Sequence, residues 1–179
     1  MSKVIVAIDP GKWHCGVAVG RDVSPRYFEL VSAHTVRIPK GSALRAARLA
    51  DIVWGHCSEY LFTADHVSFV AEGQQSYPGG SGKEDDLDAL RETNDAIETR
   101  IRHVVAFDRA PTFRRVRPHA WKGNVGKTIH HARIYRALGR AELAHLTGQP
   151  PADFPDTWDA VGLLLFAARR VGRGGTVLP

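Results

Sequence analysis

Four carboxylates in this sequence stand where a carboxyl group could do chemistry. Asp9 and Glu72 each end an apolar run, K-V-I-V-A-I-D and V-S-F-V-A-E, that would otherwise be buried strand. If the two strands are neighbours, both side chains emerge at the same sheet edge. Asp156 and Asp159 are spaced i, i+3 at the start of an apolar helix, so they share one helical face. Asp156 alone could be a helix cap, but Asp159 lies deeper in the helix.

Acids gathered in one place repel one another unless positive charge lies between them. Their hard oxygen ligands suit Mg²⁺, with Mn²⁺ able to substitute. Two such ions about 4 Å apart can activate a water and stabilise the leaving oxygen of a phosphodiester. The acids therefore predict a two-metal hydrolytic site.

The basic residues are concentrated in one segment. The formal net charge is +5, but residues 109–149 carry nine basic side chains and one acidic, whereas residues 81–108 carry four basic and eight acidic. Such a block is typical of a protein with a polyanionic partner, a solvated face being the alternative. Together with the acids it indicates a nuclease, in which these side chains hold phosphates: Arg114, Arg115, Arg117, Lys122 and Lys127.

The elements that must position these residues form a mixed sheet with helices on its faces. Apolar runs and turn residues predict strands over 3–9, 15–20, 26–38, 67–71 and 104–107, the first two joined as a hairpin across Pro10-Gly11. Helical spacing predicts helices over 42–61, from about 87 to 101, up to about 138, and from Pro155 to 168. The expected fold is α/β, a five-stranded mixed β-sheet flanked by α-helices.

The helix that follows the Gly-rich loop carries a seam pattern. Its seam positions are spaced 3, 4, 3 and 4 residues apart: Leu87, Leu90, Asn94, Ile97 and Ile101. Burial against the chain's own sheet explains this spacing, and a contact with a second copy is the alternative.

Length and composition favour one domain over residues 1–179. Cys15 and Cys57 are expected to be buried, reduced thiols. No apolar run is long enough to span a membrane and no signal peptide is evident, so we expect a cytoplasmic protein with no membrane partner. Gly126-Lys127-Thr128 lacks the upstream glycine of a P-loop, which excludes a nucleotide cofactor of that class.

Four motifs resemble, in order, those of RuvC-type Holliday-junction resolvases, particularly bacteriophage members. They are I-D-P-G from Ile8 with Gly16 following, A-E-G-Q-Q from Ala71, W-K-G-N-V-G-K-T from Trp121 and D-T-W-D-A-V-G-L-L-L from Asp156. The resemblance covers nearly the whole chain. It implies an RNase H-like fold and a homodimer that makes paired, metal-dependent incisions in branched DNA, such as a four-way junction.

The resemblance also implies site roles. The catalytic, metal-binding acids would be Asp9, Glu72, Asp156 and Asp159, with Lys122 and Lys127 against the DNA backbone. The sequence departs from the family after Glu72, where many members carry a Phe that wedges into the junction. Here Tyr77 is the aromatic residue available, and it could stack on a base or anchor the loop.

Several interpretations stay open at this point. The protein could cut flaps and forks as well as junctions, or bind DNA without cutting it. Trp121 is expected to be a packing residue rather than a base stacker, and His119 and His130 are expected at the surface, where they could touch phosphate.

Overall fold

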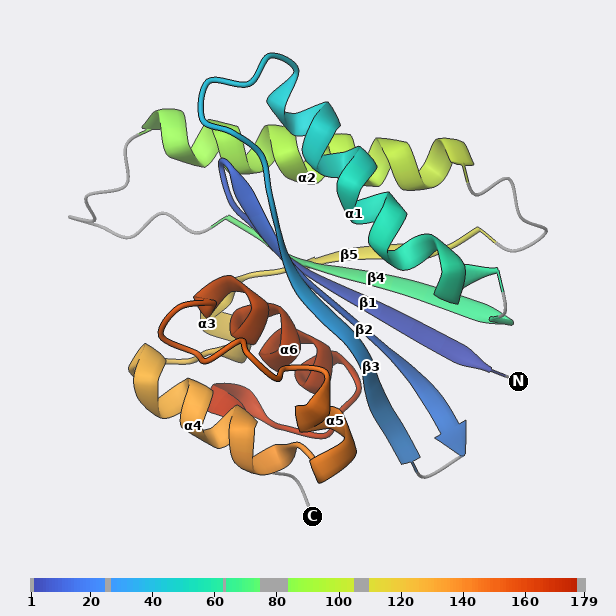
Figure 1. Ribbon diagram of the computed structural model, residues 1–179, viewed down its shortest axis with the longest axis vertical. Coiled ribbons are helices and arrows are strands. Elements are labelled where there is room, and N and C mark those ends of the chain that lie inside the picture. Colours follow the sequence, from blue (N-terminus) through green and yellow to red (C-terminus); the bar gives the residue numbers. More distant parts are fainter. Residues whose placement is uncertain (1, 25–26, 63, 75–83, 105–109, 177–179) are drawn as a thin grey trace.

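A mixed sheet in the order β3-β2-β1-β4-β5 forms the centre of the molecule (Figure 1). The structure is a computed structural model that describes residues 2–24, 27–62, 64–74, 84–104 and 110–176. The first three strands are antiparallel neighbours, whereas β4 pairs in parallel with β1 and with β5. The strands are β1 (Lys3–Pro10), β2 (His14–Ser24), β3 (Tyr27–Arg37), β4 (His66–Glu72) and β5 (Thr112–Val116).

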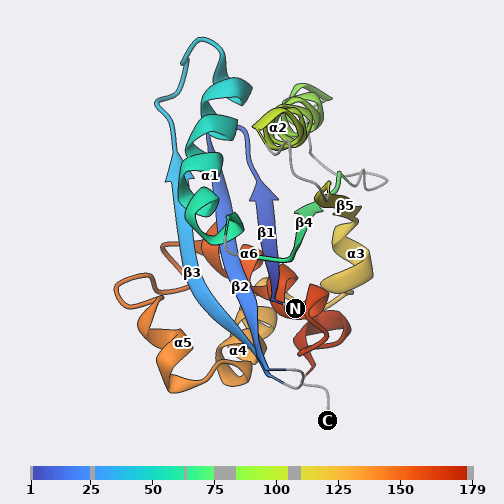
Figure 2. The ribbon, with the colours of Figure 1, turned by 90° about the vertical axis from the view of Figure 1, so that its right-hand side faces the viewer.

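Helices cover both faces of this sheet (Figures 1 and 2). One face carries α1 (Arg45–Leu61) and α2 (Glu84–Val104). The other carries α3 (Pro118–Trp121), α4 (Lys127–Ala137), α5 (Arg140–Ala144), α6 (Pro155–Ala167) and the short 3-10 turn η1 (Arg173–Gly175). The expected α/β fold with a five-stranded mixed sheet is confirmed.

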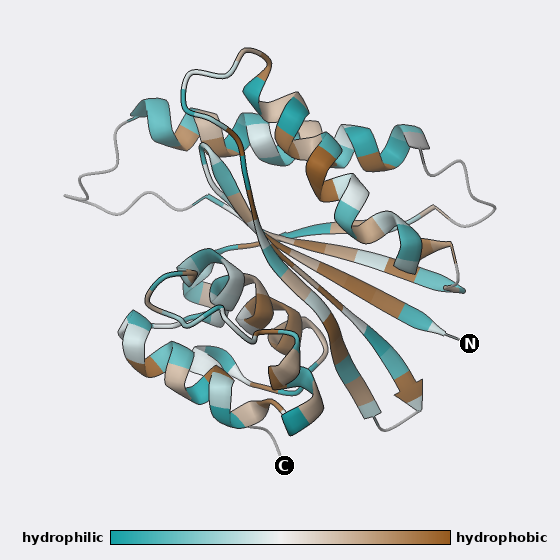
Figure 3. Cartoon of the chain, in the orientation of Figure 1, coloured by the Kyte–Doolittle hydropathy of each residue, from teal (hydrophilic) through white to brown (hydrophobic). Residues whose placement is uncertain are grey.

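The two layers of helices create two apolar cores, one on each side of β1. Val4, Val6 and Ile8 face the α1 side, while Ile5 and Ala7 face α6. A strand covered on both faces has no polar side, which explains its continuous apolar run. Helix α6 is buried without interruption from 157 to 165. Figure 3 shows the resulting band of hydrophobic residues along the central strands and α6.

The predicted start of the fifth strand was wrong. Val104, placed at the start of a strand over 104–107, is the last residue of α2, and residues 105–107 lie outside the described part of the chain. The fifth strand is instead β5, whose sequence T-F-R-R-V contains two exposed arginines. Because β5 is an edge strand, it tolerates charge that a central strand would exclude. Because of the same charge, β5 does not stand out as an apolar run in the sequence.

The seam of α2 packs mainly within the chain. Ile97 and Ile101 belong to the core beneath α1, and Asn94 is also buried. Leu87 and Leu90 are only partly buried. Burial within the chain, the interpretation favoured by the sequence, is therefore confirmed for Asn94, Ile97 and Ile101, so the seam is not available as a whole to a second copy.

The thiols also lie where the sequence predicts. Cys15 and Cys57 are free and buried, and burial raises the pKa of each to about 12. Such thiols remain protonated and unreactive at neutral pH. No helix in the described ranges is long and apolar enough to cross a membrane.

Candidate active site

The four predicted acids converge at one end of the sheet. Asp9 and Glu72 lie at the ends of β1 and β4, which pair in parallel up to Ile8 and Ala71, so both carboxylates leave the same sheet edge. Helix α6 packs on one face of the sheet and begins next to Gly16, the partner of Asp9 in the β1–β2 ladder, with Asp156 in its first turn and Asp159 three residues further on. Burial raises the pKa of Asp9 most, and the carboxylates of Glu72, Asp159 and Asp156 raise it further, as expected for acids that lie near one another.

A glycine on β2 lets α6 approach this closely. Gly16 pairs with Asp9 in the β1–β2 ladder. A Cβ atom at Gly16 would lie 1.9 Å from the backbone oxygen of Asp156 and 3.1 Å from the Cβ of Ala160. No side chain fits in this space, so the glycine sets the distance between the strand that carries Asp9 and the helix that carries Asp156.

Two lysines supply positive charge to the acids. The Nζ of Lys122 lies 2.8 Å from Glu72 Oε2 and 3.2 Å from Asp159 Oδ2, and the Nζ of Lys127 lies 2.9 Å from the same Asp159 oxygen. Burial disfavours the charge on Lys122, but Asp9, Glu72 and Asp159 outweigh burial and raise its pKa. Lys122 therefore lies inside the cluster as a fixed cation.

Burial and these charges have opposite net effects on the pKa values of two groups of acids, Asp9 and Glu72 on one side and Asp159 on the other. Burial, reinforced by neighbouring carboxylates, raises the pKa of Asp9 well above its usual value, and burial also raises that of Glu72 despite Lys122. For Asp159, burial is outweighed by the hydrogen bond from His131 and by the two lysines, which lower its pKa. Of these three acids, Asp159 is the one held most strongly in its ionised form, and Asp9 is the one whose negative charge is least offset by nearby positive charge.

Four residues that hold the acids in place were not predicted to do so. Trp121 Nε1 donates to Glu72 Oε2 at 3.1 Å, and Asn94 Nδ2 donates to the Glu72 backbone oxygen at 3.1 Å. His131 Nε2 lies 2.9 Å from Asp159 Oδ1. The fourth residue, His14, places Nδ1 2.8 Å from Asp156 Oδ2, and this contact raises the pKa of His14.

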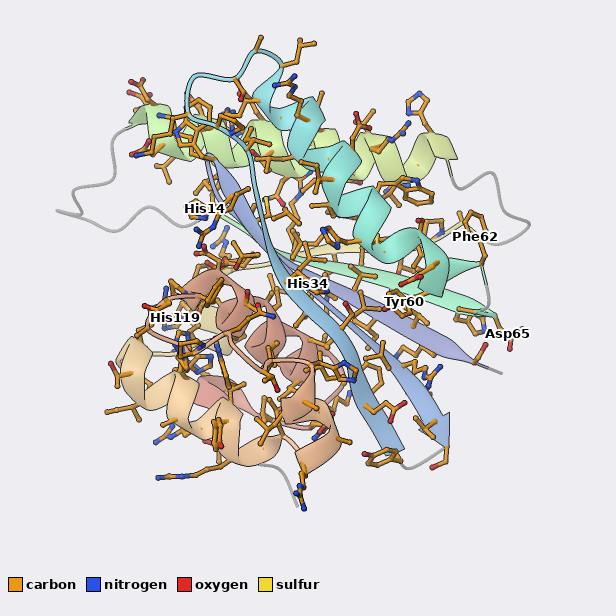
Figure 4. The ribbon with its side chains drawn as sticks, viewed as in Figure 1. His14, His34, Tyr60, Phe62, Asp65 and His119 are labelled. Carbon is orange, nitrogen blue, oxygen red and sulfur yellow. The ribbon has the colours of Figure 1, made fainter. Side chains whose placement is uncertain are left out.

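One of these four carried a partial signal in the sequence. Trp121 was expected to be a packing residue, and it is buried, but its indole nitrogen also bonds a predicted acid. His130, expected at the surface, is 2% exposed and packs edge-on against Trp121. Exposed His119 instead contacts Arg173 (Figure 4 labels His14 and His119).

The three arginines predicted to contact DNA lie on β5 and just before α3. The guanidinium of Arg115 lies 2.7 Å from Asp95 and 2.8 Å from Glu98, both on α2. Arg114 and Arg117 are exposed, Arg114 on β5 and Arg117 just before α3. Tyr77 lies outside the described residues. Of the predicted phosphate contacts, the structure brings Lys122 and Lys127 to the acids.

The donor chemistry of the cluster fits a hard divalent cation. Its ligands would be carboxylate oxygens, and a bound cation would relieve the repulsion between Asp9 and the neighbouring carboxylates, which Lys122 offsets only in part. Within the described residues, no three acidic, imidazole or thiol groups stand close enough to hold one ion as a set. Lys122 lies between Glu72 and Asp159, so an ion would have to displace its ammonium group.

Comparison with known proteins concerns the fold of the chain rather than the geometry of this site. No protein-family model and no curated protein matches the sequence. Among solved structures, Thermus thermophilus RuvC in complex with a Holliday junction substrate is 16% identical with a TM-score of 0.60, over 96% of this chain and 98% of that one. Thermus thermophilus RuvC is also matched in a second structure, with 17% identity, a TM-score of 0.57, and 95% and 98% covered.

A eukaryotic protein has the same architecture. The yeast mitochondrial Holliday junction resolvase Ydc2 is 12% identical, with a TM-score of 0.57 over 92% of this chain and 79% of that one. At these identities the likeness concerns the path of the backbone. The chain has the RNase H-like fold of the RuvC-type resolvases, and its four acids lie together at one end of that fold's sheet.

Proposed function

We propose that this protein is a divalent-metal-dependent endonuclease that resolves four-way DNA junctions by paired nicks. The observation that carries the proposal is the convergence of four carboxylates from β1, β4 and α6, with two lysine ammonium groups placed against them. The shared fold with RuvC and Ydc2, whose structures are those of junction resolvases, supports the same reading.

The four acids would hold Mg²⁺, or Mn²⁺ in its place, with two ions at each site. When bound, such ions polarise the phosphodiester and make a water more acidic. Asp159, which is ionised and bonded to His131, is the fixed anchor of the set. Asn94 and Trp121 fix the backbone and side chain of Glu72. These contacts keep the acid oxygens from rotating away from the site.

Lys127 has the exposure that a phosphate contact requires. Its side chain is 55% exposed although its Nζ lies against Asp159, whereas the side chain of Lys122 is 24% exposed. A phosphate at the edge of the site would therefore meet Lys127 first. Contacts of this kind give affinity that falls steeply with salt and carries little sequence information.

Paired nicks require two active sites on one junction, so we propose a homodimer. The buried part of the α2 seam cannot supply the whole contact, because Ile97 and Ile101 pack inside the chain. The contact would have to use the outer side of α2 or another surface. Analytical ultracentrifugation of the protein with and without junction DNA tests this, and a monomer on the junction would contradict it.

The decisive experiment compares a synthetic four-way junction with a linear duplex and a flap, in Mg²⁺, Mn²⁺ or EDTA. We expect symmetric, metal-dependent nicks on the junction alone. The variant Asp9→Asn should bind the junction without cutting it, whereas Asp153→Asn, the same chemical change at an exposed acid just before α6, should cut normally. Equal cutting of flaps would indicate a broader branch nuclease. Binding without cutting in any metal would indicate a non-catalytic DNA-binding protein.

A further inference from the structure

A groove opens beside the acid cluster, between α4 and the segment that leads into α6. Its walls come from the side of α4 that carries Lys127, His131 and Tyr135 and from Pro151, Ala152 and Pro155, and its volume is about 670 Å³. This volume is within the range of small-molecule sites, roughly 300–1,000 Å³. Lys127 and His131 line the groove and also contact Asp159. The groove, called the α4 groove below, therefore begins where the acid cluster ends.

An aromatic residue in the wall of the α4 groove is held in a fixed position. The ring of Tyr135 stacks on Trp158, with 6.0 Å between ring centroids and 25° between ring planes, yet Tyr135 remains 52% exposed. Trp158 is 2% exposed, and its Nε1 donates to the backbone oxygen of Gln149 at 2.8 Å. Trp158 lies on α6 between Asp156 and Asp159, so the exposed tyrosine is coupled to the helix that carries two of the acids.

The charge of the α4 groove complements an anion. Lys127 and Arg136 line it, and no acidic side chain does so among the described residues. An apolar cavity with an exposed aromatic ring and two cations matches a nucleotide, which offers a flat base to the ring and a phosphate to the cations. A negatively charged peptide or lipid would account for the two cations. It would account neither for the exposed aromatic ring nor for the position of the groove beside the proposed nuclease site.

We propose that the α4 groove binds one unpaired nucleotide of the cleaved strand, with its base against Tyr135 and its phosphate toward Lys127 and Arg136. The choice of DNA as the source of that nucleotide rests on the proposed function. A branch point presents bases that can leave the stack at low cost, whereas a closed duplex does not. The α4 groove would thus favour branched over linear DNA without reading a sequence, because every base has a face that stacks.

Photo-crosslinking tests the contact directly. The substrate is a four-way junction with 5-iododeoxyuridine at single positions on either side of the expected cleavage site. The protein binds this junction in EDTA, so that no cleavage occurs, and the complex is irradiated. Mass spectrometry then locates the crosslinked residue. We expect a crosslink at Tyr135 from one or two positions of the junction and none from the linear duplex. Crosslinks confined to other parts of the protein would overturn the proposal.

Variants measure what the contact contributes. Tyr135→Ala should weaken junction binding by about 5- to 150-fold, the effect of losing one base–aromatic stack, whereas Tyr135→Phe should bind normally. Ile129→Ala is the matched control, because Ile129 is 57% exposed on the same helix but outside the groove wall. Equal affinities of Tyr135→Ala and Ile129→Ala would overturn the proposal.

A second pair of variants covers the case in which Tyr135→Ala does not fold. Ala132 is exposed in the groove wall, so Ala132→Glu adds bulk and negative charge there, and Ile129→Glu makes the same charge change outside. We expect loss of the Tyr135 crosslink in Ala132→Glu only, and its persistence would overturn the proposal. A wild-type protein that cuts junctions without the crosslink would refute the groove and leave the proposed function intact. A crosslinked protein that cuts nothing would refute the function alone.

Discussion

Substitution of Gly16 by alanine should misplace the acids of α6 while leaving their chemistry unchanged. The added Cβ would lie 1.9 Å from the backbone oxygen of Asp156, and real Cβ contacts below 3.0 Å are essentially absent. Strand β2 and the start of α6 must therefore separate by at least about 1 Å. A displacement of that size at a catalytic group can cost about 100-fold in rate. Overpacking of this kind destabilises a core by about 1–3 kcal/mol.

Gly55→Ala provides a control with the same chemical change. Gly55 lies in the middle of α1, and a Cβ there would meet nothing within 4 Å. Alanine is favoured over glycine inside a helix by about 1 kcal/mol, so this variant should be slightly more stable than the wild type and equally active. The two variants are predicted to shift the melting temperature in opposite directions.

The assay is single-turnover cleavage of a four-way junction, performed well below the melting temperature of each variant. Thermal unfolding monitored by circular dichroism gives the stability change separately. We expect Gly16→Ala to lose about 100-fold in rate and to melt a few degrees lower, at about 2–4 °C per kcal/mol. A rate within threefold of the wild type would refute the reasoning, because the approach of α6 to β2 would then not control the position of Asp156.

Four further predictions concern the charged and buried groups. Lys122→Gln should tighten Mn²⁺ binding in isothermal titration calorimetry, because it removes the ammonium between Glu72 and Asp159; weaker binding would contradict this. Glu142→Ala should lose about 3–5 kcal/mol in urea unfolding, because it leaves the Arg170 guanidinium without its buried partner, and a loss below about 1 kcal/mol would count against that pairing. Burial lowers the pKa of His130 to about 4, so the folded protein holds this imidazole neutral, whereas the unfolded chain binds its proton below about pH 6.5. The free energy of unfolding is therefore highest above about pH 6.5 and decreases by up to about 3 kcal/mol as the pH falls toward 4. His130→Leu should flatten that part of the pH–stability curve, and an unchanged slope would show that another group titrates. Lys127→Ala should reduce the slope of log affinity for junction DNA against log salt by about one unit, and an unchanged slope would exclude a phosphate contact by this residue.

The helices and strands that could be predicted are those whose own residues show an apolar run or a helix start, without reference to neighbouring segments. β1 is buried on both faces and is apolar throughout, so its strand character does not depend on knowing its neighbours. α6 begins at Pro155 and continues as a buried apolar helix, which its composition also indicates. β5 could not be found in this way, because its two exposed arginines are compatible with a strand only at the edge of the sheet.

The same distinction applies to the acid cluster. Asp9 and Glu72 could be identified because each interrupts its own apolar run at a strand end. Their partners could not, because pairing depends on how distant segments meet. Asn94 follows Glu72 by 22 residues, and His131 precedes Asp159 by 28. The seam pattern places Asn94 on the packed face of its helix, but nothing in either segment alone shows which acid these side chains contact.

The basic block shows most clearly that the role of a charged side chain depends on its position in the folded structure. Arg115 and Lys122 lie seven residues apart in one basic block, and composition treats them alike. In the structure Arg115 is paired with Asp95 and Glu98, so the acidic excess of 81–108 cancels part of the basic excess that follows it. Lys122 is likewise engaged by carboxylates, in this case those of the candidate active site. The positive charge left to meet DNA is therefore smaller than the sequence suggests, and the side chains that retain exposure beside the acids, led by Lys127, must carry most of the local attraction for phosphate.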